Sequence, residues 1–164
     1  MNTMTDARTR WVYAFVKDPR SLLARAADAL RPGGAMVMHE YVDYRAWRLS
    51  PRSEVFEGFV EEVIASWRAT GGEPDIGLAL PGWLAELGME VRALTPLTFA
   101  PRVGDPEWAW PTAFVDTGVK RLIDLGRLDA AHGKAIADAY ARTQRTPGAF
   151  QVTPTVIEIV ALKP

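Results

Sequence analysis

The stretch LRPGGAMVMHE, Leu30 to Glu40, decides how this chain folds. Its Arg-Pro-Gly-Gly segment, residues 31–34, ends a helix and turns the chain, because proline cannot continue a helix and glycine tolerates turn conformations. The next five residues, Ala35–His39 (AMVMH), form a short apolar run bounded by turn residues, which is typical of a buried strand. The stretch therefore predicts the end of a helix, a turn and an inner strand in succession.

The residues before this stretch predict the helix that it ends. Asp18-Pro19 is a helix start, since the aspartate caps free N–H groups and the proline occupies the first turn at no cost. Leucine and alanine residues follow at helical spacing. Residues 11–16 (WVYAFV) form an apolar run that is too short to classify by periodicity. The first ten residues, MNTMTDARTR, are expected to form a loose lead-in rather than an element of the fold.

The residues after the stretch alternate between helical and extended patterns. The apolar residues from Val55 to Trp67 recur at helical spacing and predict a long helix, which the Gly-Gly-Glu-Pro segment at 71–74 ends. The expected order of helices and strands is mixed α/β, in one domain covering residues 1–164. The remaining predicted elements are a short helix at 80–87, a strand at 89–100, helices at 113–125 and 129–143, and a β-branched strand at 155–162.

Composition excludes several classes of function. The net charge of −1 offers no basic surface for nucleic acid, and the absence of cysteine excludes disulfides and thiolate metal sites. The two histidines, His39 and His132, lack a carboxylate spacing that would predict a metal site. The polar N-terminus lacks the apolar segment of a signal peptide, and no stretch approaches the ~18 apolar residues that cross a bilayer. We expect a cytoplasmic protein with no membrane or nucleic-acid partner.

Three parts of the sequence together resemble class I S-adenosylmethionine-dependent methyltransferases, in the C-terminal part of that fold. The "LRPGG" turn after a helix that starts at "DP" is a mark of these enzymes, and the likeness covers roughly residues 10 to 162. The parts that carry it are Arg10-Trp11-Val12 with Asp18-Pro19 and Leu30 to Glu40, then Gly72 to Gly77 with Leu87-Gly88-Met89, then Thr153 to Val160.

The resemblance implies an incomplete Rossmann-like sheet, with strands corresponding to the fifth, sixth and seventh of the family and with helical insertions. It implies S-adenosylmethionine as cofactor and a small molecule as methyl acceptor. The family binds its cofactor through an acidic-glycine motif (D/E-x-G-x-G) after the first strand and an acidic residue ending the second. This chain starts where the fourth strand should end, and polar residues 5–8 replace that strand's apolar run. Asp75-Ile76-Gly77 imitates the motif, but no apolar strand precedes it.

The resemblance also places the candidate site residues, because ligands lie beyond the carboxyl ends of parallel strands. His39 and Glu40 are the candidate catalytic residues, either of which could accept a proton from the acceptor. Alternatively, both satisfy local backbone groups. Arg10 and Trp11 would lie near the methyl donor. The candidate substrate-binding residues, several of which could instead be aromatic core, are Tyr41, Asp43, Tyr44, Trp47, Trp108 and Trp110.

The sequence and the resemblance lead to two alternative hypotheses for the function. The first is a methyltransferase that is inactive as this isolated chain, because the main cofactor motif is missing. The second is a non-catalytic module, derived from a methyltransferase, that binds a small ligand or a protein. An exposed sheet edge also predicts a partner, since unpaired strand edges invite pairing. That partner would be a second copy in a homodimer or a separate chain that supplies the N-terminal half.

Overall fold

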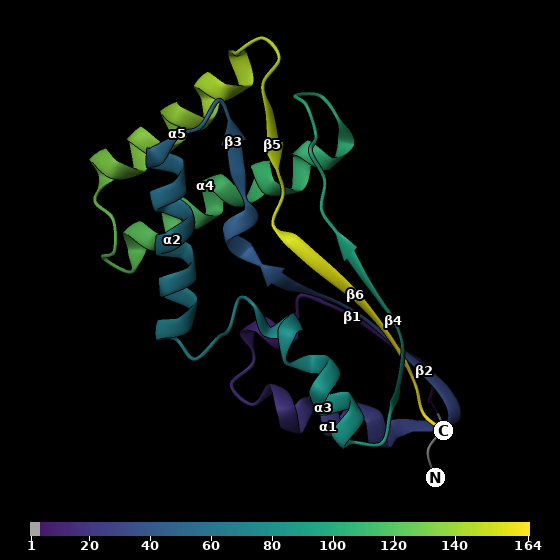
Figure 1. Cartoon of the computed structure of the whole chain (residues 1–164). Coiled ribbons are helices and arrows are strands. Elements are labelled where there is room, and N and C mark those ends of the chain that lie inside the picture. Colours follow the sequence, from purple (N-terminus) through teal and green to yellow (C-terminus); the bar gives the residue numbers. More distant parts are fainter. Residues whose placement is uncertain (1–3) are drawn as a thin grey trace. The chain divides into compact units, whose positions relative to one another are not determined.

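The computed structural model describes residues 4–164, which form two compact units (Figure 1). Unit 1 holds the described residues up to Asp43, together with Gly71–Leu97 and Thr155–Pro164. Unit 2 holds Tyr44–Thr70 and Thr98–Pro154. Each unit therefore combines segments that are distant in the sequence. The expectation of one domain over residues 1–164 stays a prediction.

Unit 1 is built on a four-stranded sheet in the order β1-β2-β6-β4. Strand β1 lies parallel to β2, whereas β6 is antiparallel to both of its neighbours, β2 and β4. The mixed α/β class is thus as the sequence predicts. The strands are β1 (Met4–Arg10), β2 (Leu30–Asp43), β4 (Glu90–Leu97) and β6 (Thr155–Leu162).

The prediction that the first ten residues are a loose lead-in was wrong for the described part, Met4–Arg10. These residues form β1, whose residues Asp6 to Arg10 pair in register with Ala35 to His39 of β2. Residues 1–3 lie outside the described part of the chain. The polar sequence of β1 is tolerated because this edge strand is mostly exposed, so its backbone pairing with β2 does not depend on an apolar run.

Helices cover one face of the sheet in unit 1. Helix α1 (Pro19–Ala29) begins as expected, with the Asp18 carboxylate accepting the Ser21 N–H at 2.9 Å. Figure 1 shows α1 beside α3 (Leu80–Glu86). Alternate residues of β2 and β6 face these helices, as the pleat requires. The core of unit 1 consists of Tyr13, Ala14, Leu23, Ala27, Leu30, Met36, Met38, Ile76, Leu80, Leu84, Met89, Ile159 and Ala161.

Gly77, in the segment that imitates a cofactor motif, has a structural role. It lies in the short 3-10 helix η3 (Ile76–Leu78), against strand β2. A Cβ atom at Gly77 would lie 2.7 Å from the Tyr41 carbonyl oxygen and 2.8 Å from Val42 Cγ1. The glycine therefore permits η3 to pack directly on the sheet.

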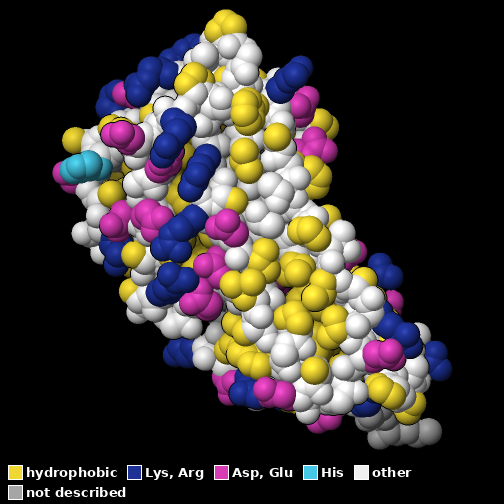
Figure 2. Space-filling view, viewed as in Figure 1, with side chains coloured by type: hydrophobic (Ala, Val, Ile, Leu, Met, Phe, Trp, Pro, Cys, Tyr) yellow, Lys and Arg dark blue, Asp and Glu magenta, His cyan; other side chains and the backbone are white. Residues whose placement is uncertain are grey.

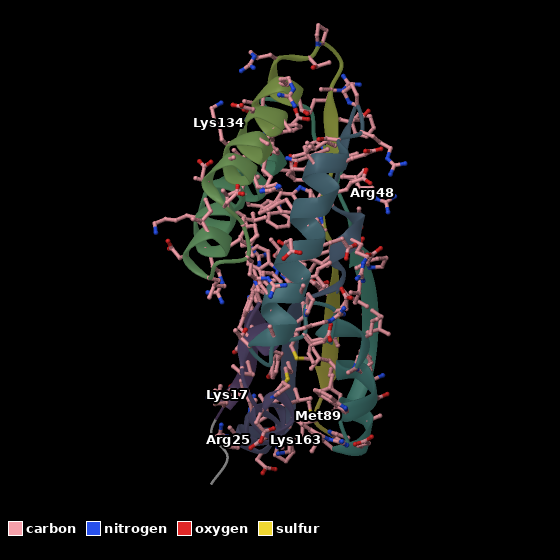
Figure 3. All side chains as sticks on the ribbon, turned by 90° about the vertical axis from the view of Figure 1, so that its left-hand side faces the viewer. Lys17, Arg25, Arg48, Met89, Lys134 and Lys163 are labelled. Atoms are coloured by element: carbon pink, nitrogen blue, oxygen red, sulfur yellow. The ribbon has the colours of Figure 1, made fainter. Side chains whose placement is uncertain are left out.

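The C-terminal residues of unit 1 contact the end of helix α1. At the C-terminus, Lys163 Nζ donates to the Ala27 carbonyl at 2.8 Å and to that of Asp28 at 3.3 Å, which satisfies free acceptors at the end of α1 (Figure 3).

On the α3 side of unit 1, hydrophobic side chains gather at the surface over η3, α3 and β4 (Figure 2). The exposed apolar residues of those elements include Leu78 and Leu94.

Unit 2 consists of three long helices and a two-stranded sheet. Helix α2 (Glu54–Ala69) begins at the cap Ser53, and α5 (Ala130–Arg145) begins at the cap Asp129, which accepts the His132 N–H at 2.7 Å. Helix α4 (Ala109–Asp124) starts four residues before its predicted position. Strands β3 (Arg48–Ser50) and β5 (Phe150–Val152) pair in antiparallel orientation, which the sequence did not predict.

Aromatic side chains form the core of unit 2. Trp47 is fully buried, and its ring lies 5.0 Å from that of Phe56 in an edge arrangement. Tyr44 packs on Trp67 at 4.8 Å, and Trp108 packs on Tyr140 at 5.9 Å between ring centroids. Such pairs stabilise a core beyond the area they bury. In residues 4–164, no helix is long and apolar enough to cross a membrane.

Candidate functional site

Polar side chains gather where the parallel pairing of β1 with β2 ends. Arg10 is the last residue of β1, and its Cα partner on β2 is His39. Because β1 and β2 are parallel, their carboxyl ends lie at the same edge of the sheet, where α/β proteins bind ligands. The structure therefore brings together Arg10, Trp11, His39 and Tyr41, four of the predicted site residues.

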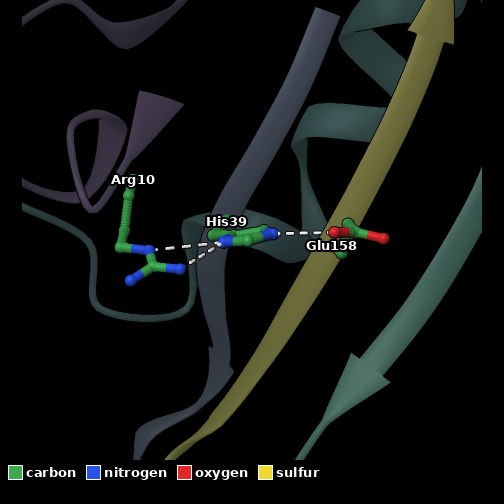
Figure 4. A network of polar contacts seen from close by, with 3 residues as sticks. All are labelled: Arg10, His39 and Glu158. Atoms are coloured by element: carbon green, nitrogen blue, oxygen red, sulfur yellow. Dashed lines mark hydrogen bonds and ion pairs between the residues drawn. The ribbon is translucent and has the colours of Figure 1, made fainter. Parts of the chain in front are cut away.

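Arg10, His39 and Glu158 form a row across three neighbouring strands (Figure 4). The Arg10 guanidinium donates from Nε and Nη2 to His39 Nδ1, at 3.3 and 3.1 Å. His39 Nε2 lies 2.9 Å from a carboxylate oxygen of Glu158. Since arginine has only donors, Nδ1 is the acceptor nitrogen and Nε2 carries the ring proton. This row fixes the neutral tautomer of His39.

A shallow pocket of about 390 Å³ opens over this row. It lies on the face of the sheet opposite the core of unit 1, because His39 and Val37 alternate along β2 with the buried Met36 and Met38. The lining combines cationic, neutral polar and anionic groups with one apolar side chain. The lining residues are Arg8, Thr9, Arg10, Val37, His39 and Glu158.

Trp11 follows Arg10 in a left-handed backbone conformation, with φ of +53°. A non-glycine residue adopts this conformation at a cost, so neighbouring contacts must hold it. The Trp11 N–H donates to the His39 carbonyl at 2.9 Å, and the indole stacks on the Tyr41 ring at 5.7 Å and 6°. The Arg10 guanidinium lies 5.5 Å from the centre of the Trp11 ring. The turn thus presents an aromatic pair with a cation beside it.

Glu40 points to the opposite face of the sheet from His39 and is fully buried. Its Oε1 accepts the N–H groups of Val12 and Tyr13, at 2.7 and 3.0 Å, whereas Oε2 has no partner among the described residues. Burial raises the pKa of Glu40 above its usual range, and the backbone N–H groups offset part of that rise. Glu40 therefore does not join His39 in one site, and its contacts hold the turn that carries Trp11.

Two tyrosines near Glu40 stay protonated at neutral pH. Burial, followed by the Glu40 charge, raises the pKa of Tyr13 to about 12. The same two causes raise the pKa of Tyr41 further. The Tyr41 hydroxyl is therefore a neutral group that can donate or accept a hydrogen bond, but it is not a phenolate base.

The other predicted substrate residues do not line the pocket over Arg10, His39 and Glu158. Asp43, at the end of β2, is exposed. Tyr44, Trp47 and Trp108 are buried in the core of unit 2, where Trp47 Nε1 donates to Gln151 Oε1 at 2.9 Å. Trp110 is half-buried in α4. These aromatic residues thus belong to unit 2, whereas Arg10, His39 and Glu158 belong to unit 1.

Sequence reasoning missed Glu158. This residue is 119 positions from His39 and faces it because β6 pairs antiparallel with β2. The available signal was a single carboxylate within the apolar strand TVIEIVAL, at a position that alternation places on one face with Val156 and Val160. Within residues 4–164, no group of three or more histidine or carboxylate side chains could hold a metal ion.

Comparisons with known proteins identify the fold. No protein-family model and no curated protein matches the sequence. A solved protein from Bacillus halodurans C-125, described as a methyltransferase, matches over 100% of this chain and 73% of its own, with a TM-score of 0.55 and 13% identity. The [4+2]-cyclase SpnF matches over 99% of this chain and 52% of its own, with a TM-score of 0.50 and 14% identity.

A third solved structure is a Haemonchus contortus phosphoethanolamine N-methyltransferase 2 in complex with S-adenosyl-L-methionine. It matches over 99% of this chain, with a TM-score of 0.46 and 15% identity. The chain spans about a third of that protein and about half of SpnF (34% and 52%). The match to the Bacillus protein covers the whole chain, and the chain has a class I methyltransferase fold.

Proposed function

We propose that the chain is part of an S-adenosylmethionine-dependent methyltransferase that methylates a small molecule, and that it is inactive in isolation. The observation that carries the proposal is the contact of Arg10 with His39, where β1 ends beside its parallel neighbour β2, in a chain matched along its whole length by a methyltransferase-like fold. That edge of the sheet is where such folds bind ligands.

Methyl transfer is an in-line displacement, so an enzyme contributes mainly alignment and exclusion of water. In this proposal, Arg10 and the Trp11–Tyr41 stack position the methyl donor and the acceptor at the edge of the sheet. His39 accepts a proton where the acceptor is a hydroxyl or an amine. Glu40 keeps the turn of Trp11 in place rather than touching the substrate. S-adenosylmethionine supplies the methyl group when it is bound.

The proposed inactivity of the isolated chain rests on its sequence. The 164 residues contain no acidic-glycine motif that follows an apolar strand, and Gly77 in the imitating segment serves the packing of η3 on β2. The main contacts to the cofactor would then come from a further polypeptide segment, such as a separate chain that adds strands beside β1. The outer edge of β1 pairs with no other strand among the described residues, which suits such an addition.

A non-catalytic binding module is the second candidate. We retain this candidate because one fold can carry more than one function, and one structural neighbour is named as a [4+2]-cyclase. In that case, the chain would bind an aromatic or apolar small molecule without any methyl donor.

Calorimetric titration of the purified chain with S-adenosylmethionine and with S-adenosylhomocysteine tests the proposal. Thermal unfolding of the same sample must first show a cooperative transition, so that a negative result refers to folded protein. We expect no binding of either compound by the isolated chain. Micromolar binding would contradict the proposed inactivity. Binding of an aromatic compound such as indole without the cofactor would favour the second candidate.

A further inference from the structure

His39 cannot accept a proton in the arrangement that the structure shows. A neutral imidazole has one ring nitrogen that donates and one that accepts. Nε2 donates to Glu158 at 2.9 Å, and the only lone pair, on Nδ1, is covered by the Arg10 guanidinium at 3.1 Å. A role for His39 as a proton acceptor therefore requires that Arg10 moves away first.

Arg10 is suited to such a movement because an anion would bind it better than His39 does. Its side chain is exposed, and among residues 4–164 it forms no ion pair with a carboxylate. Its contacts are with a neutral ring nitrogen and with the face of Trp11. A carboxylate or phosphate attracts the guanidinium by its charge and can accept two parallel hydrogen bonds from it, whereas the ring nitrogen is neutral and offers one lone pair. An anionic group in the pocket would therefore compete with His39 for the guanidinium.

The pocket beside Arg10 can hold such a group. Its volume of about 390 Å³ is lined on the β1 side by Arg8 and Arg10. Arg8 pairs with Asp6 at 3.5 Å, but both side chains are largely exposed, so this pair exchanges readily with a ligand. Figure 4 shows Glu158 on the far side of the His39 ring from Arg10, so its carboxylate holds the ring without competing for the guanidinium.

We propose that this pocket binds a carboxylate or phosphate group of a small ligand through Arg10 and Arg8, and that the bound anion withdraws Arg10 from His39 Nδ1. Glu158 is then a positioning residue, because it keeps the ring proton on Nε2 and the lone pair on Nδ1. Ligand binding and the availability of a proton acceptor are coupled in this arrangement. Anion binding does not depend on the proposed function, whereas the use of His39 as a base rests on it.

Nitrogen NMR of the histidine rings tests the proposal directly. The chain has only two histidines, His39 and His132, so a His132→Gln protein labelled with ¹⁵N-histidine reports on His39 alone. Protonated and unprotonated ring nitrogens give well-separated signals. The titrants are inorganic phosphate and acetate, at a constant ionic strength set with sodium chloride. The titrations are made at about pH 8, where an ordinary histidine ring is neutral.

We expect a saturable change of the Nδ1 signal with phosphate, acetate or both, while Nε2 stays protonated. A response to only one of them identifies the group that the pocket takes. Arg10→Gln should abolish this anion-dependent change, because it removes the guanidinium whose withdrawal from Nδ1 the signal reports. Arg25→Gln, which removes an exposed arginine from α1, is the matched control and should have no effect.

Two results would overturn the proposal: no change of the Nδ1 signal with either anion, or an equal response in the Arg10→Gln protein. The experiment contains neither S-adenosylmethionine nor a methyl acceptor. Its failure would therefore leave methyl transfer open, and a failed cofactor titration would leave the anion site open.

Discussion

The buried carboxylate of Glu40 accepts the backbone N–H of Val12 at 2.7 Å, which ties the middle of the sheet to the turn after β1. A second bond, from the Tyr13 N–H at 3.0 Å, makes the carboxylate a cap for the 3-10 helix η1 (Tyr13–Phe15). The arrangement satisfies two buried donors, but it also keeps an ionisable group away from water.

Glu40 should make the stability of the fold depend on pH. Because its pKa is raised above the ordinary value of 4.5, the native state holds the proton more tightly than the unfolded chain does. Its stabilising contribution is therefore complete below pH 4.5 and is lost as the pH rises through the native-state pKa. We expect the free energy of unfolding of the wild type, relative to Glu40→Gln, to fall over that range in urea titrations. Parallel pH profiles would contradict this.

Removing the acceptor at position 40 should be most costly at low pH, where the stabilising contribution of Glu40 is complete. Glu40→Ala leaves the N–H groups of Val12 and Tyr13 without an acceptor in the interior, which we expect to cost about 2–3 kcal/mol. Glu40→Gln keeps an acceptor oxygen and should retain most of the stability at low pH. Urea unfolding of both variants measures the difference.

Trp11 gives a prediction about backbone conformation. Its φ of +53° favours glycine over alanine, so Trp11→Gly should be more stable than Trp11→Ala by about 1 kcal/mol. Both variants lose the stack on Tyr41, so their comparison isolates the backbone. Trp83, inside helix α3, is the control. Because a helix favours alanine, Trp83→Ala should be more stable than Trp83→Gly by about 1 kcal/mol. The same order at both positions would count against a left-handed Trp11.

Gly77 should not accept even a methyl group. A Cβ atom would lie 2.7 Å from the Tyr41 carbonyl oxygen, so Gly77→Ala must displace η3 from the sheet at a cost of about 2–3 kcal/mol. Gly82, inside α3, has open space around its Cβ position, and Gly82→Ala should stabilise by about 0.5–1 kcal/mol. Thermal unfolding of the two variants should give shifts of opposite sign.

Trp47 should behave as a core residue of unit 2 when its hydrogen bond is removed. Gln151→Leu leaves the buried Trp47 N–H without its acceptor, which we expect to cost about 1–3 kcal/mol. Gln144→Leu, on the half-buried surface of α5, should change stability by less than about 0.5 kcal/mol. Equal effects in urea unfolding would mean that the bond between Trp47 and Gln151 contributes little.

The elements that the sequence predicted best are those set by local interactions. Asp18 and Asp129 each cap the helix that follows, because a cap depends only on residues three positions apart. Strand β6 has the predicted bounds, Thr155–Leu162, since its β-branched run fits a pleated surface. Strand β1 could not be predicted in the same way, because its pairing partner lies about 30 residues along the chain and its own residues are polar.

The same difference between local and long-range interactions applies to the candidate site. Arg10 and His39 were predicted from the resemblance to methyltransferases, and the structure joins them. Glu158 was missed because antiparallel pairing between β2 and β6, rather than sequence proximity, brings it to His39. Alternation along β2 also places His39 and Glu40 on opposite faces, which a motif of two adjacent residues does not reveal.

The division of the chain into units has a consequence for producing one unit by itself. The polypeptide passes from one unit to the other after Asp43, Thr70, Leu97 and Pro154. Both parts of unit 2 are thus interruptions in the coding sequence of unit 1, one of 27 residues and one of 57 (Tyr44–Thr70 and Thr98–Pro154). A gene for unit 1 alone would need two splices, Asp43 to Gly71 and Leu97 to Thr155.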